Sequence, residues 1–230
     1  MNQKVLELAK MIDHTLLHPT ATDADLEREC ALAIKYNVAS MCVKPYWVKK
    51  TSDLLHGTDV KVGCVIGFPA GNSKIEVKVF EAEMACRDGA VEIDMVINIA
   101  RALEGDWNYV EKEIAEVTNV CHKHGAIVKV IFEVDYITNE QDVIKLCEIC
   151  TKVEADYVKT STGFGFVKQA NGDFNYKGAT VDIISLMRKH SGPKVKVKAA
   201  GGVRTLDQLL AVKEAGATRS GATATAAIME

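Results

Sequence analysis

Residues 158–165 (VKTSTGFG) place a lysine at the end of a short apolar run, and hydroxyls and glycines follow it at once. This pattern is typical of a barrel strand whose last inward residue faces a phosphorylated substrate, because the run forms the strand and the glycines form an open loop. A neutral lysine amine attacks carbonyl carbons and forms Schiff bases. Lys159 is therefore the first candidate for covalent chemistry.

Charged residues recur on one face of four predicted strands, since residues two apart on a strand share a face. Lys159 shares its face with Tyr157, and the other same-face pairs are Glu92 with Asp94, Lys129 with Glu133, and Lys196 with Lys198. The opposite faces carry Val and Ile, which are expected to pack against helices. The charged faces must therefore point into a barrel.

Three of these side chains are predicted to be catalytic: Lys159, Lys198 and Asp94. They lie near the strand ends at which barrel enzymes place their active sites. The other inward charges are predicted to form a supporting ionic network: Glu92, Lys129, Glu133 and Lys196. Purely structural pairing is the alternative for all of them, because a buried ion is costly unless it is paired.

Lys159 needs a lowered pKa to act as a nucleophile, because a free lysine with a pKa of about 10.4 is protonated at neutral pH. Burial and a neighbouring ammonium both disfavour the charged form. A pKa near 7 requires roughly 4 kcal/mol, which burial and Lys198 together are expected to supply. A Schiff base then draws electrons from a neighbouring bond, and Asp94 suits the proton transfers, directly or through water.

Two further glycine-rich segments, residues 199–204 (AAGGVR) and 220–223 (SGAT), follow the last two predicted strands. Glycines expose backbone N–H groups, and a helix that begins after such a loop adds its positive end. Barrel enzymes commonly bind phosphate after strands 7 and 8. These segments are therefore predicted to bind the phosphate group.

The elements that must position these residues are short β-branched runs alternating with helical segments. The runs cover residues 12–16, 38–43, 60–66, 91–97, 127–133, 156–159, 195–198 and, weakly, 217–221. Eight such units predict a single-domain (β/α)₈ TIM barrel over residues 1–230, with an additional N-terminal helix at Lys4–Met11. A doubly wound open sheet is the alternative. No G-x-G-x-x-G follows an early strand, so a dinucleotide site has no support.

Local signals mark four helix starts and one unusual loop. Thr22, Ser73, Thr138 and Thr205 each have a carboxylate or amide three residues later, as in a capping box. Residues 166–177 (FVKQANGDFNYK) are too polar for a core element and are predicted to form a small β-hairpin around Asn171-Gly172. The hairpin is either a lid over the site or a surface excursion without catalytic duty.

The bulk composition is that of a soluble globular protein: 230 residues, 48% hydrophobic and a formal net charge of -3. No basic excess favours nucleic acid, and no run of about 18 apolar residues favours a membrane. The 7 cysteines are scattered through apolar surroundings, which indicates reduced thiols. We expect a cytoplasmic protein with a small-molecule partner and no metal, and the oligomeric state, a homodimer included, stays open.

Four motifs together resemble the deoxyribose-phosphate aldolase family: residues 158–165, Glu92–Asn98 (EIDMVIN), Val197–Arg204 (VKAAGGVR) and Asp13–Thr15 (DHT). They occur in the order and roughly the spacing of that family, and the resemblance covers essentially the whole chain. It implies a (β/α)₈ barrel and a class I aldolase without metal or cofactor. The implied reaction reversibly cleaves 2-deoxy-D-ribose 5-phosphate, a sugar phosphate, to acetaldehyde and glyceraldehyde 3-phosphate.

The resemblance also assigns roles to individual residues. It implies that Lys159 forms the Schiff base, that Lys198 lowers the pKa of Lys159, and that Asp94 donates and accepts protons. It places Asp13 and Thr15 near the sugar hydroxyls and Cys42 near the pocket. The implied phosphate site is lined by Thr162, Gly163, Gly201, Gly202, Gly221 and, where the family usually has serine, Thr223.

One departure from the family is a polar residue in the last strand, since Ser220 stands where the family usually has an aliphatic residue. Some loss of packing is expected there. Two other functions remain open: a different Schiff-base barrel, such as a transaldolase or keto-acid aldolase, and a noncatalytic sugar-phosphate binder. The choice of donor substrate distinguishes the other Schiff-base enzymes from a deoxyribose-phosphate aldolase. Cleavage of deoxyribose phosphate distinguishes the aldolase from a noncatalytic binder.

Overall fold

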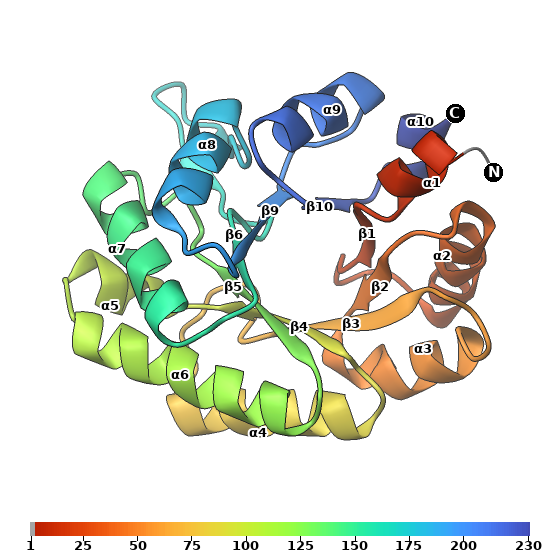
Figure 1. The fold of residues 1–230 in the computed structure, drawn as a ribbon, viewed down its shortest axis with the longest axis horizontal. Helices are drawn as coiled ribbons and strands as arrows, with labels where there is room; N and C mark the ends of the chain where they lie inside the picture. The colour runs from red at the N-terminus through yellow and green to blue at the C-terminus, as the bar shows by residue number, and fades with distance from the viewer. Residues whose placement is uncertain (1–2) are drawn as a thin grey trace.

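A closed barrel of parallel strands forms the centre of the computed structural model, which describes residues 3–230. Within this range the barrel has eight strands, in the order β1-β10-β9-β6-β5-β4-β3-β2, and helices surround it (Figure 1). The strands are β1 (Ile12–Leu16), β2 (Ser40–Val43), β3 (Lys61–Ile66), β4 (Glu92–Val96), β5 (Ile127–Ile131), β6 (Tyr157–Lys159), β9 (Lys196–Ala200) and β10 (Arg219–Ala222). The closure confirms the predicted TIM barrel and rules out the open sheet.

Helices follow the barrel strands and cover their outer faces. They are α2 (Asp23–Tyr36), α3 (Val48–Leu54), α4 (Ile75–Arg87), α6 (Trp107–Lys123), α7 (Glu140–Lys152), α8 (Val181–His190), α9 (Leu206–Glu214) and α10 (Thr225–Met229). Shorter segments are the 3₁₀ turn η1 (Pro45–Trp47) and α5 (Ile99–Leu103). The predicted N-terminal helix is present as α1 (Gln3–Ala9).

The alternation of residues along the strands separates the apolar core from the charged barrel interior. Val128, Val158 and Val197 are fully buried and belong to the large apolar cluster that includes residues of the surrounding helices. A much smaller apolar cluster contains Leu17, Cys42 and Val65, with two partly buried phenylalanines packed against it. Apolar side chains thus hold the helices on the barrel, while strand parity leaves the interior to the charged residues.

Two of the four predicted helix caps are confirmed. Thr22 with Asp25 and Thr205 with Gln208 form reciprocal capping boxes at the starts of α2 and α9. The prediction for Thr138 was one residue early, because Asn139 caps α7 by accepting from the Gln141 N–H. The prediction for Ser73 was wrong, because α4 begins at Ile75 and no side chain caps it.

The predicted hairpin is present between β6 and α8. Its strands β7 (Val167–Lys168) and β8 (Phe174–Asn175) pair antiparallel, and Gly172 adopts a positive φ of 91° in the connecting turn. The excursion separates β6 from β9 in sequence, yet these strands are neighbours in the barrel. The residues at both ends of the hairpin therefore lie next to the carboxyl ends of two adjacent strands.

Ser220 gives the first testable prediction, because it is fully buried and its hydroxyl has no hydrogen-bond partner among residues 3–230. An unpaired buried hydroxyl destabilises the folded state by about 1–3 kcal/mol, and an aliphatic side chain removes that cost. We expect Ser220→Val to raise the free energy of unfolding by about 1 kcal/mol in urea titrations. A lowered midpoint would show that the site has no room for the extra methyl group.

Candidate active site

The charged faces of six strands meet inside the barrel in one ion-pair network. Register brings the residues together, since Asp94 lies beside Lys129 and Lys159 lies beside Lys198 on neighbouring strands. β1 adds Asp13 and β10 adds Arg219. These side chains come from positions up to 206 residues apart, so only barrel closure assembles them.

Asp94 is the centre of the network. Its Oδ2 accepts hydrogen bonds from Lys159 Nζ at 2.7 Å and from Lys198 Nζ at 2.6 Å. Its Oδ1 accepts no hydrogen bond from the described residues, although Lys129 Nζ lies 3.1 Å away. The three lysines hold the pKa of Asp94 far below its usual range, despite the opposing effect of burial. Asp94 is therefore ionised, and Oδ1 is its oxygen with the fewer hydrogen-bond donors among the described residues.

The two predicted catalytic lysines have opposite pKa shifts, although both are buried and both contact Asp94. Burial lowers the pKa of Lys159, and the ammonium of Lys198 adds to this effect while Asp94 opposes it. Burial also disfavours the charge on Lys198, but Asp13 and Asp94 outweigh it and raise the pKa of Lys198. Among residues 3–230, Lys198 has two carboxylate partners and Lys159 has one. Lys159 is thus the lysine that loses its proton more readily.

The count of charges supports the same assignment. Among the described residues of the network, the carboxylates are Asp13, Glu92 and Asp94, and the cations are Lys129, Lys159, Lys198 and Arg219. One cation is therefore in excess when every group is ionised. When Lys159 is neutral, the barrel interior holds three charges of each sign. This balance has a lower free energy than an interior with one unpaired buried cation.

Asp13 lies beneath the pocket rather than in it. Its carboxylate is fully buried and accepts from Lys129 at 2.8 Å and from Ser40 Oγ at 2.7 Å, and it also pairs with Arg219 and Lys198. These three cations and one hydroxyl occupy both carboxylate oxygens of Asp13. The position does not support the predicted contact with sugar hydroxyls, and Asp13 instead anchors the cations under Asp94.

Two predictions about the supporting network were wrong. Lys196 is exposed and forms no ion pair within residues 3–230, because it is the first residue of β9, where its Nζ lies 5.6 Å from the centroid of the Tyr157 ring. Glu133 is buried but forms no ion pair with any described residue; it lies two residues beyond the end of β5, where a φ of 59° turns the chain. Its carboxylate accepts from the N–H and the hydroxyl of Thr162, and burial raises its pKa.

A pocket of about 220 Å³ opens above the network at the carboxyl ends of the strands. Lys159 lines it, together with all the predicted substrate and phosphate residues except Asp13: Thr15, Thr162, Gly163, Gly201, Gly202, Gly221 and Thr223. Positive φ angles of 81°, 85° and 92° at Gly163, Gly201 and Gly202 match loops that only glycine adopts readily. The structure thus brings the lysine and the glycine loops to one cavity.

Thr162 is less available to a ligand than the sequence indicates. Its hydroxyl proton and its N–H are directed to Glu133, and its oxygen accepts from the N–H of Phe164 at 2.9 Å. Glu133 therefore fixes the loop after β6 through Thr162. The neighbouring Gly163 also lines the pocket, and its single N–H is the donor that it can offer to a ligand.

Some residues of the site were missed by sequence reasoning. His18, Phe164 and Tyr176 line the pocket, and Ser40 and Arg219 join the network below it. Cys42 was expected near the pocket and lies in the small apolar cluster with Leu17 and Val65, where burial raises the pKa of its thiol to about 11.

The part of the chain that the structure describes contains no group of three or more His, Cys, Asp or Glu side chains arranged to hold a metal ion. No helix within residues 3–230 has the length and hydropathy needed to cross a membrane. The carboxylates of the barrel interior are all engaged by cations instead.

Comparisons with known proteins agree with this geometry. The family model described as DeoC/LacD family aldolase matches residues 7–228. The chain is 49% identical over 223 residues to the deoxyribose-phosphate aldolase of Rhodopirellula baltica, covering 97% of this chain and 88% of that protein. It is also 49% identical over 227 residues to the enzyme of that name from Thermococcus gammatolerans, covering 98% and 96%.

Solved structures give the same result for the fold. The structure of a tetrameric deoxyribose phosphate aldolase from Aeropyrum pernix superposes with a TM-score of 0.87 at 29% identity, covering 98% of this chain and 90% of that one. An aldolase named QR15 superposes with a TM-score of 0.87 at 35% identity, covering 97% and 94%.

Proposed function

Since the chain belongs to the DeoC/LacD family of aldolases, we propose that it reversibly cleaves 2-deoxy-D-ribose 5-phosphate to acetaldehyde and D-glyceraldehyde 3-phosphate. The single observation that carries the proposal is the contact of two buried lysines with one carboxylate oxygen, Asp94 Oδ2, at the base of a glycine-rich pocket. A protein that only binds sugar phosphates has no use for a second buried lysine beside the first.

The proposed reaction starts with the neutral amine of Lys159. Nζ attacks the C1 carbonyl of the open-chain sugar, and loss of water gives a protonated Schiff base. A base then removes the proton of the C3 hydroxyl, the C2–C3 bond breaks, and its electrons enter an enamine on C1–C2. The C3 aldehyde leaves as glyceraldehyde 3-phosphate. Protonation of C2 and hydrolysis of the Schiff base release acetaldehyde and restore Lys159.

Asp94 has the position for these proton transfers. The low pKa that its lysine neighbours impose means that it enters the cycle as an acceptor. Its Oδ1, which lacks a hydrogen-bond donor among the described residues, is the atom that accepts the proton, directly or through water. Lys198 remains protonated throughout, so its charge keeps favouring the neutral form of Lys159.

Cleavage of deoxyribose 5-phosphate, followed by release of acetaldehyde, tests the proposed reaction. In the synthetic direction, acetaldehyde is expected to serve as donor, whereas dihydroxyacetone and pyruvate are not. Turnover with either of those donors in place of acetaldehyde would assign the chain to another Schiff-base aldolase. If the protein binds deoxyribose phosphate but does not cleave it in a single turnover, it is a noncatalytic sugar-phosphate binder.

Asp94→Asn is expected to lower kcat by about 10²- to 10⁴-fold, the range for loss of a general acid–base group. The amide keeps the shape of the side chain but accepts a proton poorly. It also removes the charge that favours protonated Lys159, so the amine itself stays reactive. Stopped-flow measurements should therefore show normal Schiff-base formation and slow C–C cleavage. Equal losses in both steps would contradict the assigned role.

The setting of this activity is also part of the proposal. We place it in one domain over residues 1–230 in the cytoplasm, acting on a small-molecule sugar phosphate. The Aeropyrum pernix relative is described as a tetramer. Measurement of the mass of this protein in solution distinguishes a homodimer from a larger assembly.

A further inference from the structure

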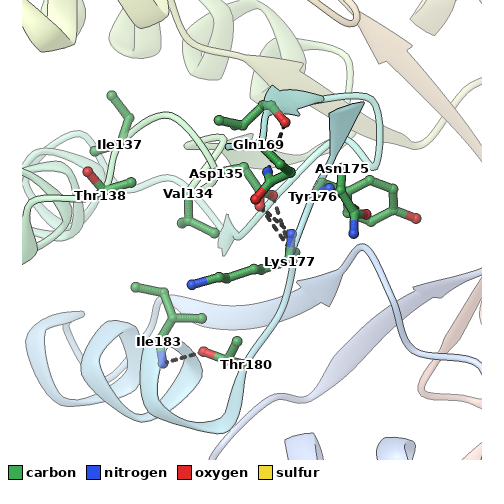
Figure 2. Close-up of a pocket in the computed structure, with 12 residues that line it drawn as sticks. Val134, Asp135, Ile137, Thr138, Gln169, Asn175, Tyr176, Lys177, Thr180 and Ile183 are labelled. Carbon is green, nitrogen blue, oxygen red and sulfur yellow. Dashed lines mark hydrogen bonds between the residues drawn. The ribbon is translucent and has the colours of Figure 1, made fainter. Parts of the chain in front are cut away.

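The hairpin is fastened to the active-site loops just after Tyr176. Asp135, in the loop after β5, accepts from the Lys177 N–H at 2.5 Å and from the Gly178 N–H at 3.1 Å, as the dashed lines at Lys177 in Figure 2 show in part. The next residue, Ala179, donates its N–H to the carbonyl of Gly201 at 3.0 Å. The segment that carries Tyr176 is therefore held between the β5 loop and the glycine loop after β9.

Contact between the hairpin and that glycine loop is so close that it admits no side chain. A Cβ on Gly178 would lie 2.4 Å from the Gly201 carbonyl oxygen. Tyr176 packs edge-to-face on Phe166, with ring centroids 5.5 Å apart. The ring of Tyr176 thus has a fixed place relative to the loop predicted to bind phosphate.

Tyr176 separates two cavities. It lines the 220 Å³ pocket that contains Lys159, and it also lines a pocket of about 500 Å³ between the hairpin, the β5 loop and the start of α8 (Figure 2). The hairpin therefore contributes one side chain, Tyr176, to the wall of the active site.

The hydroxyl of Tyr176 contacts a cationic side chain. Arg204 Nη2 donates to the Tyr176 hydroxyl at 3.2 Å, and Arg204 lines the Lys159 pocket. Lys159 and Arg204 are the only Lys or Arg side chains lining that pocket in the described chain. Lys159 is reserved for the Schiff base, so Arg204 is the cation left for the phosphate. Because its side chain is exposed, Arg204 would lose rotamer freedom on binding unless it were ordered beforehand.

From these contacts we infer that Tyr176 is a positioning residue that sets the preference for phosphorylated substrates, by holding the Arg204 guanidinium toward the phosphate before substrate arrives. This inference rests on the proposed function and extends it to one side chain of the hairpin. The hairpin then acts as a fixed wall with a part in specificity, and no opening or closing motion is required of it.

Tyr176→Phe tests the inference, because it keeps the ring and removes only the hydroxyl. We expect KM for deoxyribose 5-phosphate to rise about three- to tenfold, the range for one ordinary hydrogen bond of about 0.7–1.4 kcal/mol, with kcat within twofold. The kcat/KM for unphosphorylated deoxyribose should not change. Tyr136→Phe is the matched control, because its hydroxyl donates to the hairpin carbonyl of Phe166 and not to Arg204.

A double-mutant cycle shows whether Tyr176 acts through the arginine. In an Arg204→Met background, Tyr176→Phe should add less than twofold to KM. An undiminished effect there, equal losses on both substrates, or the same KM change in Tyr136→Phe would overturn the inference.

Calorimetry with inorganic phosphate keeps this test separate from the proposed reaction. Tyr176→Phe should weaken phosphate binding by the same three- to tenfold factor, again about the value of one hydrogen bond. Unchanged phosphate affinity contradicts the inference even if the enzyme is an active aldolase. Absence of cleavage by the unmodified protein contradicts the proposed function and leaves the phosphate measurement to decide on Tyr176.

Discussion

Borohydride reduction in the presence of acetaldehyde should add two carbons to Lys159 Nζ and inactivate the protein. The amine condenses with the aldehyde, water leaves, and hydride fixes the carbon–nitrogen bond as a secondary amine. Peptide mapping should find the added mass of one ethyl group at Lys159 alone. Of the two lysines that donate to Asp94 Oδ2, only Lys159 has a lowered pKa and lines the pocket, so Lys198 should stay unlabelled.

Replacement of the same lysine should have the largest effect of any single change. Lys159→Met removes the nucleophile, and we expect kcat to fall by about 10⁴-fold or more, since the covalent route supplies most of the rate enhancement. Lys196→Met is the matched control, because this exposed lysine is on β9 but outside the network. A Lys159→Met protein that retains turnover, or a label on another lysine, would refute the Schiff-base assignment.

Lys198→Leu should also lower activity strongly, and its signature is in the pH profile. Lys198 helps to lower the pKa of Lys159, so its removal raises that pKa. The amine is reactive above its pKa and protonated below it. The acidic limb of the kcat profile should therefore shift toward higher pH, and kcat at neutral pH should fall tenfold for each pH unit by which the limb moves.

Two controls separate this mechanism from simple loss of structure. Lys198 also neutralises Asp13 and Asp94, so its removal is expected to destabilise the fold by about 3–5 kcal/mol. A protein that has merely lost structure does not recover at alkaline pH, whereas one with a raised Lys159 pKa does. Inorganic phosphate should still bind, because the glycine loops are unchanged. Near-normal kcat at neutral pH would show that Lys198 does not tune Lys159.

The barrel and its inward charges could be predicted because strand parity is a property of the backbone alone. Asp94, Lys129, Lys159 and Lys198 face the interior wherever their strands lie in the sheet. Parity gives direction but not depth along the strand. For this reason it failed at Lys196, which lies beside Tyr157 at the exposed amino end of β9, and at Glu133, where the chain has already turned away.

Other parts of the site depend on contacts between distant segments that no local pattern records. Arg219 belongs to a strand with weak β propensity, so its inward direction was not predicted from the sequence, although it pairs with two carboxylates. Tyr176 reaches the pocket only because Asp135 and Gly201 fasten the hairpin there. The buried position of Asp13 likewise follows from its partners and not from its own motif.

During synthesis of the chain, the acidic and basic partners of the network are made at different times. Asp13 is on the first strand, while its partner Arg219 follows 206 residues later on the last. At a synthesis rate of about 5–20 residues per second, the ribosome makes Arg219 roughly 10–40 s after Asp13. Until then the acid is more stable in water than in an interior that lacks its full set of cations. We therefore expect the first strand to remain exposed on the nascent chain until the last strand closes the ring and neutralises the acid.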